Sequence, residues 1–252
     1  MSWSGKRKFG YLTLFVGVIV LFAGVPIFFS FYEKPTCFDG KINQGERGVD
    51  CGGPCSQLCS ADYTAPRIFW TYQTRVVSGV YNVMAYGENP NQSVGAEDVP
   101  YSFKLYDAEG ILVAEKRGRG SIPPASKFAF FEGGIQTGKR EPVRATVDII
   151  SSPQWTFARA YTSLRTLSID VSSEGVGTRA EARIKNEYIN TTIADINAVI
   201  ILYDAEGNRV AFSKTRIESI APGETQTLYF TWPESIADKV VKNELVFSGM
   251  IR

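Results

Sequence analysis

The sequence contains one six-residue string twice, Leu105-Tyr106-Asp107-Ala108-Glu109-Gly110 and Leu202-Tyr203-Asp204-Ala205-Glu206-Gly207, with starts at positions 105 and 202. This spacing is far longer than a solenoid repeat and is about the length of one small β-sandwich domain. A second shared signal, Ser121-Ile122-Pro123-Pro124 and Ser219-Ile220-Ala221-Pro222, follows each string at nearly the same distance. The sequence therefore predicts two copies of one domain.

Turn chemistry accounts for the repeated string. Before the first copy, apolar and polar residues alternate in Tyr101–Leu105, as in a strand with one buried face. Asp-Ala-Glu-Gly then favours a type I turn, in which Asp accepts backbone N–H groups and Gly takes the last position. Each copy is thus predicted to be a β-hairpin, with turn-forming residues Asp107 and Gly110 in the first and Asp204 and Gly207 in the second.

Composition limits the classes of function. Of 252 residues, 44% are hydrophobic and 21% are charged, which is typical of globular proteins. Lys and Arg total 27 against 26 acidic residues, so no basic surface for nucleic acid is expected. The chain has no His, and so lacks the commonest general base and the commonest transition-metal ligand.

The segment Tyr11–Tyr32 contains no charged residue. As a helix it would span roughly 33 Å, enough to cross a hydrocarbon core of about 30 Å. A cleaved signal peptide is less favoured, because no A-x-A site follows. Since Lys6, Arg7 and Lys8 precede the segment, the positive-inside rule places the N-terminus in the cytoplasm. We expect a single-pass plasma-membrane protein whose remaining residues are extracytoplasmic.

All four cysteines, Cys37, Cys51, Cys55 and Cys59, lie in one short Gly-rich segment. Outside the cytoplasm, this arrangement predicts two disulfides, and the sequence leaves three pairings open. A zinc site is the competing interpretation, but the spacing lacks paired Cys-x2-Cys knuckles.

The same segment carries oxygen ligands suited to calcium at Asp39, Asn43, Glu46 and Asp50. The alternative, slightly favoured, is that its Asp-Gly, Asn-x-Gly and Gly-Gly-Pro sequences only form turns. Calcium is the one cofactor considered, and otherwise none is expected.

Two motifs resemble known families. The pattern CxDGxxNxxExGVDCGGxC over Cys37–Cys55 is similar to a Cys-rich motif of secreted and surface-anchored bacterial proteins, which implies a surface setting. Phe103-Lys104-Leu105-Tyr106-Asp107 resembles the hallmark of the FxLYD family of bacterial and archaeal envelope domains, which are similar to immunoglobulin-like sandwiches and have no known catalytic role. Asn89-Pro90-Asn91 resembles a neighbouring signal. The second copy departs from the family at Ile200 and has Asn190-Thr191-Thr192 instead.

We therefore predict an all-β protein of two tandem immunoglobulin-like antiparallel sandwiches. The expected parts are an N-terminus (1–10), a transmembrane helix (11–32), a Cys-rich segment with linker (33–65), and sandwiches at 66–153 and 154–252. Strands are expected at Arg67–Val77, Val80–Tyr86, Tyr101–Tyr106, Leu112–Glu115, Lys127–Phe131 and Arg144–Ile150, and at Leu164–Val171, Thr178–Lys185, Asp195–Tyr203, Arg209–Arg216, Thr225–Thr231 and Glu244–Ile251. Gly87–Asp98 is expected to be a long exposed loop.

The strand Ala198–Tyr203 is apolar on both faces, so its outer face requires a cover. We expect the first sandwich, or a partner subunit, to provide it. Because the linker before Trp155 and Phe157 is short, these aromatics are expected at the junction, and the pair of sandwiches is expected to be rigid.

Two classes of function follow. The favoured one is a non-catalytic binding, adhesion or envelope-assembly module that meets an unidentified protein or glycan. The alternative is a cell-wall glycan-acting enzyme that uses a carboxylate pair, which is the minimum glycoside hydrolysis requires. Acid pairs inside the turns, Asp107 with Glu109 and Asp204 with Glu206, are better explained as turn residues, so no catalytic residue is predicted.

Overall fold

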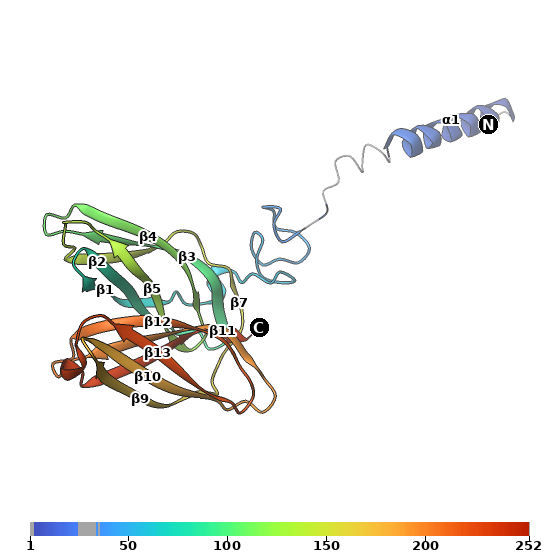
Figure 1. Cartoon of the computed structure of the whole chain (residues 1–252). Helices are drawn as coiled ribbons and strands as arrows, with labels where there is room; N and C mark the ends of the chain where they lie inside the picture. The colour runs from blue at the N-terminus through green and yellow to red at the C-terminus, as the bar shows by residue number, and fades with distance from the viewer. Residues whose placement is uncertain (1–2, 25–33, 35, 252) are drawn as a thin grey trace. The chain divides into compact units, whose positions relative to one another are not determined.

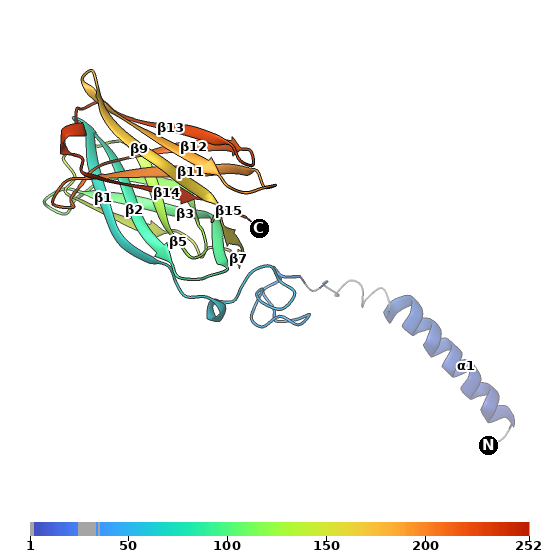
Figure 2. The same ribbon diagram turned by 90° about the horizontal axis from the view of Figure 1, so that it is seen from below.

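The structure is a computed structural model that describes residues 3–24, 34 and 36–251. It divides into two compact units, Met1–Cys55 and Ser56–Arg252. Antiparallel strands dominate the second unit, as Figures 1 and 2 show from two directions, so the all-β prediction is confirmed.

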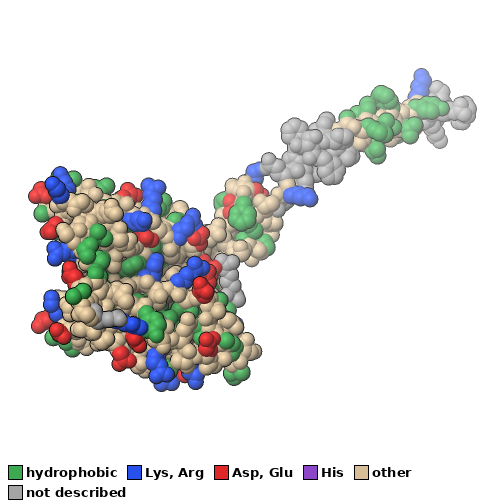
Figure 3. All heavy atoms as spheres, in the orientation of Figure 1, with side chains coloured by type: hydrophobic (Ala, Val, Ile, Leu, Met, Phe, Trp, Pro, Cys, Tyr) green, Lys and Arg blue, Asp and Glu red, His purple; other side chains and the backbone are tan. Residues whose placement is uncertain are grey.

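Helix α1 (Trp3–Ile19) begins the first unit and continues into a π-helical turn, η1 (Val20–Gly24). Hydrophobic side chains cover much of α1, as Figure 3 shows. No helix within the described residues is long and apolar enough to cross a membrane. The predicted span, Tyr11–Tyr32, lies partly outside those residues and stays a prediction.

The first sandwich has one sheet of order β1-β2-β5 and a second of order β4-β3-β6, with β7 also paired to β3. A short 3-10 turn, η2 (Ser60–Asp62), precedes it. Its strands are β1 (Arg67–Val77), β2 (Val80–Asn89), β3 (Val94–Tyr106), β4 (Leu112–Ile122), β5 (Ser126–Gln136), β6 (Arg144–Ile149) and β7 (Trp155–Phe157).

The second sandwich repeats this order, with sheets β9-β10-β13 and β12-β11-β14. The equivalence of β1 to β9, β2 to β10 and so on shows that the repeated string belongs to a repeated fold. The strands are β9 (Leu164–Glu174), β10 (Gly177–Asn186), β11 (Ile193–Tyr203), β12 (Arg209–Ile220), β13 (Thr225–Trp232) and β14 (Lys242–Ser248); short β8 (Arg159–Ala160) and β15 (Met250–Ile251) pair with each other, and η3 (Ala237–Lys239) is a 3-10 turn.

One loop prediction is wrong. Most of the expected loop Gly87–Asp98 is strand, because β2 continues to Asn89 and β3 begins at Val94. Asn89 and Ala96 are fully buried. The Gly, Asn and Pro residues that suggested an exposed loop instead form a tight connection and a bulged strand.

Each sandwich has its own core between its sheets. Phe103, Phe128 and Phe130 lie in the first core, and Ile184, Ile200 and Phe230 are among the residues of the second. In β11, alternate residues face that core, so the strand's other side chains point away from it.

A third apolar cluster joins the sandwiches. The outer face of sheet β1-β2-β5 contributes Met84 and Phe131, and the outer face of sheet β12-β11-β14 contributes Ile201 and Phe212. Ile201 and Phe212 are fully buried. The first sandwich is therefore the cover that the doubly apolar strand Ala198–Tyr203 requires, as predicted.

The residues expected at the junction lie elsewhere. Trp155 is 2% exposed within the core of the first sandwich, and its ring stacks on Tyr63 at a centroid distance of 4.7 Å. Phe157 is 68% exposed. Strand β7 follows residue 153, where the boundary was expected, yet it pairs with β3 of the first sandwich. The predicted role of Trp155 in the junction is wrong.

Candidate functional site

The cysteines form disulfides. Cys37 is bonded to Cys55, Cys51 and Cys59 are also disulfide-bonded, and no cysteine of the described chain is free. The prediction of two disulfides is confirmed. The competing zinc interpretation is excluded for this state, because a disulfide sulfur is no thiolate ligand.

The residues considered for calcium are engaged mainly with the loop's own N–H groups. Asp50 accepts bonds from the N–H groups of Asp39 and Gly40 at 2.9–3.1 Å. Asp39 accepts from the Asn43 side chain at 2.8 Å, and this bond is the first cause that lowers the Asp39 pKa. Glu46 is 8% exposed and accepts from Asp50 N–H at 3.3 Å.

The structure does not gather these carboxylates around one point. Among the described residues, the group of acidic and sulfur ligands close enough for one ion is Cys37, Glu46 and Cys55, and its two sulfurs form a disulfide. The turn-forming role accounts for the bonds that Asp39 and Asp50 make. Calcium binding stays an untested prediction.

The two repeated turns have the geometry that their sequence favours. In the first, Asp107 Oδ1 accepts the N–H of Ile111 at 2.8 Å, and Gly110 has φ of +77°. In the second, Asp204 Oδ1 accepts the N–H of Asn208 at 2.7 Å, and Gly207 has φ of +81°. Asp107 and Asp204 therefore shape the two hairpins.

A feature that sequence reasoning missed lies where β3 and β11 begin. Asp98 and Asp195 both have φ of +54°, a left-handed conformation uncommon for residues other than Gly and best tolerated by Asn and Asp. The register with the neighbouring strand skips both residues. Their positions differ by the same 97 residues as the repeated strings, so the feature itself is repeated.

Each of these aspartates forms an ion pair with an arginine of the adjacent strand. Arg119 of β4 pairs with Asp98, and Arg216 of β12 donates from Nε to Asp195 Oδ1 at 2.8 Å. The four side chains are 61–70% exposed. Arg119 and Arg216 are also 97 residues apart, so both sandwiches carry the same Asp–Arg pair.

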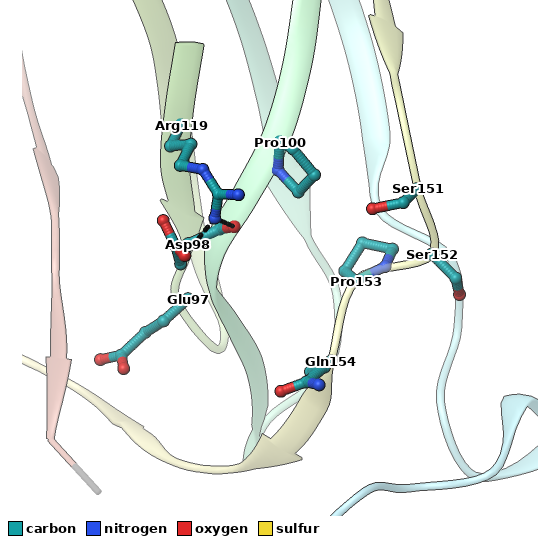
Figure 4. Close-up of a pocket in the computed structure, with 8 residues that line it drawn as sticks. All are labelled: Glu97, Asp98, Pro100, Arg119, Ser151, Ser152, Pro153 and Gln154. Atoms are coloured by element: carbon teal, nitrogen blue, oxygen red, sulfur yellow. Dashed lines mark hydrogen bonds and ion pairs between the residues drawn. The ribbon is translucent and has the colours of Figure 1, made fainter. Parts of the chain in front are cut away.

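Packing of the sandwiches brings the two pairs together. A cavity of about 230 Å³ is lined by both pairs with Gly120, Ser121 and Asn197. A second cavity of about 270 Å³ shares Asp98 and Arg119, and is also lined by Glu97, Pro100 and residues 151–154. Figure 4 shows Asp98 beside Arg119, facing Ser151, Pro153 and Gln154 across this cavity. We call the two cavities with their two ion pairs the twin Asp–Arg groove.

The groove presents groups that can hydrogen-bond to a ligand. Its side chains offer guanidinium and amide donors beside carboxylate and hydroxyl acceptors. Ser121, Ser151 and Ser152 supply its hydroxyl groups. The sequence signal for this groove is that Asp98 matches Asp195, and Arg119 matches Arg216, at the 97-residue spacing of the repeat.

A second polar cluster lies across the contact between sandwiches. Glu244 of β14 accepts bonds from the hydroxyls of Tyr86 at 2.5 Å and Tyr203 at 3.3 Å, and from Lys127 at 3.2 Å. Burial, and then the bond to Glu244, raises the pKa of Tyr86 to about 12. Burial and the charge of Glu244 raise the pKa of Tyr203 to about 12. These residues join the two sandwiches through polar bonds beside the apolar cluster.

Comparisons with known proteins give little further information. No family model and no curated protein matches the chain. Among solved structures, it is similar to a β-glucuronidase from glycoside hydrolase family 2, with 12% identity, a TM-score of 0.23, and coverage of 62% of this chain and 20% of that one. It is also similar to red sea bream transglutaminase, with 11% identity, a TM-score of 0.25, and coverage of 74% and 29%. The chain thus spans less than a third of either protein.

Proposed function

We propose that the protein is a membrane-anchored, extracytoplasmic binding module without catalytic activity, in which tandem immunoglobulin-like sandwiches of the FxLYD type present a ligand-binding surface. The observation that carries the proposal is the complete oxidation of Cys37, Cys51, Cys55 and Cys59. Stable disulfides are typical of oxidising compartments and rare in the cytosol.

The N-terminal segment supports an anchor that crosses the membrane next to that oxidising compartment. Its uncharged run follows three basic residues, which favours an N-terminus in the cytoplasm and a C-terminal region outside. Apolar side chains of α1 are exposed, including Leu12 and Phe15 at 60% and 63%, as a lipid-facing helix requires. The sandwiches would then be tethered to the extracytoplasmic side of the plasma membrane.

A binding role, as opposed to the alternative glycan-acting enzyme, is supported by the groove's chemistry. Asp98 is engaged by Arg119, and Asp195 by Arg216, so each carboxylate is held in an ion pair. Glycoside hydrolysis needs one carboxylic acid that donates a proton and one carboxylate that acts as nucleophile or base. The paired arrangement suits recognition better than this chemistry.

Single-cysteine labelling in intact cells tests the proposal. Because the native cysteines are oxidised, Ser4→Cys and Val241→Cys each introduce one free thiol. Val241 is 71% exposed. A membrane-impermeant maleimide should label the Val241→Cys protein in cells whose outer barrier is permeabilised, and the Ser4→Cys protein only after lysis. The opposite labelling pattern, or four free thiols in the native protein, would contradict the proposal.

A further inference from the structure

We propose that the twin Asp–Arg groove binds a neutral, polyhydroxylated ligand, namely a glycan chain. This inference rests on the proposed binding function and specifies its ligand. Three features of the groove support this ligand: the charges of its side chains, its hydrogen-bonding groups and its division into two small cavities.

The charged side chains of the groove disfavour an anionic ligand, because its lining holds three carboxylates, those of Glu97, Asp98 and Asp195, against two guanidinium groups. Each guanidinium of the groove lies against a carboxylate, since Arg119 pairs with Asp98 and Arg216 with Asp195. An anion that approaches either arginine meets the adjacent aspartate, and a cation that approaches the aspartate meets the arginine. The pairs thus favour a ligand without net charge that can satisfy both partners at once.

A sugar diol satisfies both partners. Each hydroxyl can accept one hydrogen bond and donate another, so two adjacent hydroxyls can accept from the guanidinium and donate to the carboxylate of one pair. Asn197 and Gln154 add amide groups that can do the same. The apolar residues that line the groove are two prolines, Pro100 and Pro153. An extended peptide is less favoured, because peptide recognition relies on pockets for apolar side chains.

The size of the cavities fits successive sugar units. At about 270 and 230 Å³, each is smaller than the roughly 300–1,000 Å³ that holds a drug-sized ligand. The cavities share Asp98 and Arg119, so they adjoin. A chain of sugars can therefore occupy both, and a tetrasaccharide should bind more tightly than a monosaccharide.

The backbone conformation offers a clean substitution. Asn tolerates a left-handed φ as well as Asp does, so Asp98→Asn with Asp195→Asn removes both carboxylates while the strands keep their shape. A matched control is Asp148→Asn on the outer face of β6, where the carboxylate pairs with Lys104 at 2.8 Å and is 56% exposed. It removes the same type of exposed pair away from the groove.

The experiment uses the full chain in a zwitterionic detergent without sugar groups. Cellotetraose, mannotetraose and chitotetraose are the neutral probes, with their monosaccharides, a heparin-derived tetrasaccharide and a Ser-Gly repeat peptide for comparison. Saturation-transfer NMR and calorimetry should show saturable binding of at least one neutral tetrasaccharide, at least tenfold tighter than its monosaccharide. The double variant should weaken that binding at least tenfold, and Asp148→Asn less than twofold.

Three results would overturn the inference. They are failure of every neutral tetrasaccharide to bind, unchanged binding in the double variant, and tighter binding of the anionic tetrasaccharide or the peptide. Because cysteine labelling in cells reports location independently, a protein that labels outside the cell but binds no neutral sugar would lose only this choice of ligand. A protein that labels inside the cell would lose the proposed function itself.

Discussion

The outer faces of β3 and β11 differ sharply, although the two strands hold the same place in sandwiches of the same strand order. Where the face around β3 carries polar residues, the face around β11 carries apolar ones. By register, the matched pairs are Ser102 with Val199, Lys104 with Ile201, Glu115 with Phe212, and Asp148 with Val246. The polar set forms its own bonds, including Ser102 to Glu115 at 2.8 Å, and the apolar set is buried against the first sandwich.

The opposite sheets show the reverse difference. Met84 and Tyr86 of β2 enter the apolar contact, and the matched positions of β10 are Glu181 and Arg183. Sheet β1-β2-β5 of the first sandwich thus packs on sheet β12-β11-β14 of the second, which is not its equivalent in the repeat. A head-to-tail contact of this kind can in principle continue into a filament. The two remaining faces carry polar residues at the matched positions, such as Lys104 and Glu181, so they do not repeat this apolar contact.

The largest expected effect comes from placing the β3 residue on β11. Ile201→Lys buries an ammonium group at a fully buried position. The acid opposite it on β14, Glu244, is already bonded to Tyr86, Tyr203 and Lys127, so it does not compensate the new charge fully. We expect the free energy of unfolding in urea to fall by about 3–5 kcal/mol, as for other uncompensated buried charges. The reciprocal change, Lys104→Ile, should alter it by less than about 1 kcal/mol, because Lys104 is partly exposed and loses only an ion pair with the exposed Asp148. Equal losses of stability in the two variants would contradict the view that the outer face of β11 is buried and that of β3 is not.

A smaller effect should be the same in both sandwiches. Asn89 and Asn186 are fully buried, and each side-chain amide donates to two backbone carbonyls at 2.7–3.0 Å. Replacing either with Ala leaves those carbonyls unsatisfied, so we expect each change to cost about 2 kcal/mol in denaturant unfolding. If only one of the two changes lowers the free energy of unfolding, the buried Asn does not play the same role in both sandwiches.

The two hairpin turns should differ modestly. Asp107 is 7% exposed and receives a bond from Arg140 at 2.6 Å, and Asp204 is held by the neighbouring Asn208 side chain at 3.0 Å. We expect Asp107→Ala to cost about 1–2 kcal/mol and Asp204→Ala about half as much, because the first loses a charged partner as well as the turn bond. Thermal unfolding of both variants would measure this, and a larger loss at Asp204 would contradict it.

The polar cluster at the contact predicts a mild pH dependence. Burial and Glu244 raise the pKa of Tyr86 and Tyr203 to about 12, so the folded protein holds these protons more tightly than the unfolded chain. The stabilisation is complete below about pH 10, the ordinary pKa of tyrosine, and is lost as pH rises toward 12. Unfolding midpoints should therefore fall from pH 10 to 12, and the fall should be shallower in Tyr86→Phe with Tyr203→Phe. If the midpoint falls equally steeply with pH in that variant, Tyr86 and Tyr203 do not cause the pH dependence.

The repeat and the hairpins were predictable because their signals are local. Alternation in Tyr101–Leu105 and the turn residues after it predict a hairpin directly. The pairing of β7 was not predictable, because Trp155 could serve a core or a junction equally well. The role of Asn186 was not predicted, because Asn190-Thr191-Thr192, four residues later, offers a competing Asn signal.

The twin groove was missed for a different reason. A left-handed Asp at a break in strand pairing has no local signature, and only the match of Asp98 and Arg119 with Asp195 and Arg216 at the repeat spacing marks it. That the pairs adjoin depends on how the sandwiches pack, which local sequence patterns do not determine.

The central claim is that the apolar face of β11 fixes the two sandwiches in one orientation. Glu109 and Glu206 are exposed turn residues at matched positions of the repeat, so Glu109→Cys with Glu206→Cys allows spin labels on both sandwiches. Pulsed electron spin resonance should give one narrow distance distribution in this protein and a broad one when Ile201→Lys is added. A broad distribution without Ile201→Lys would show two independently moving sandwiches and would contradict the claim.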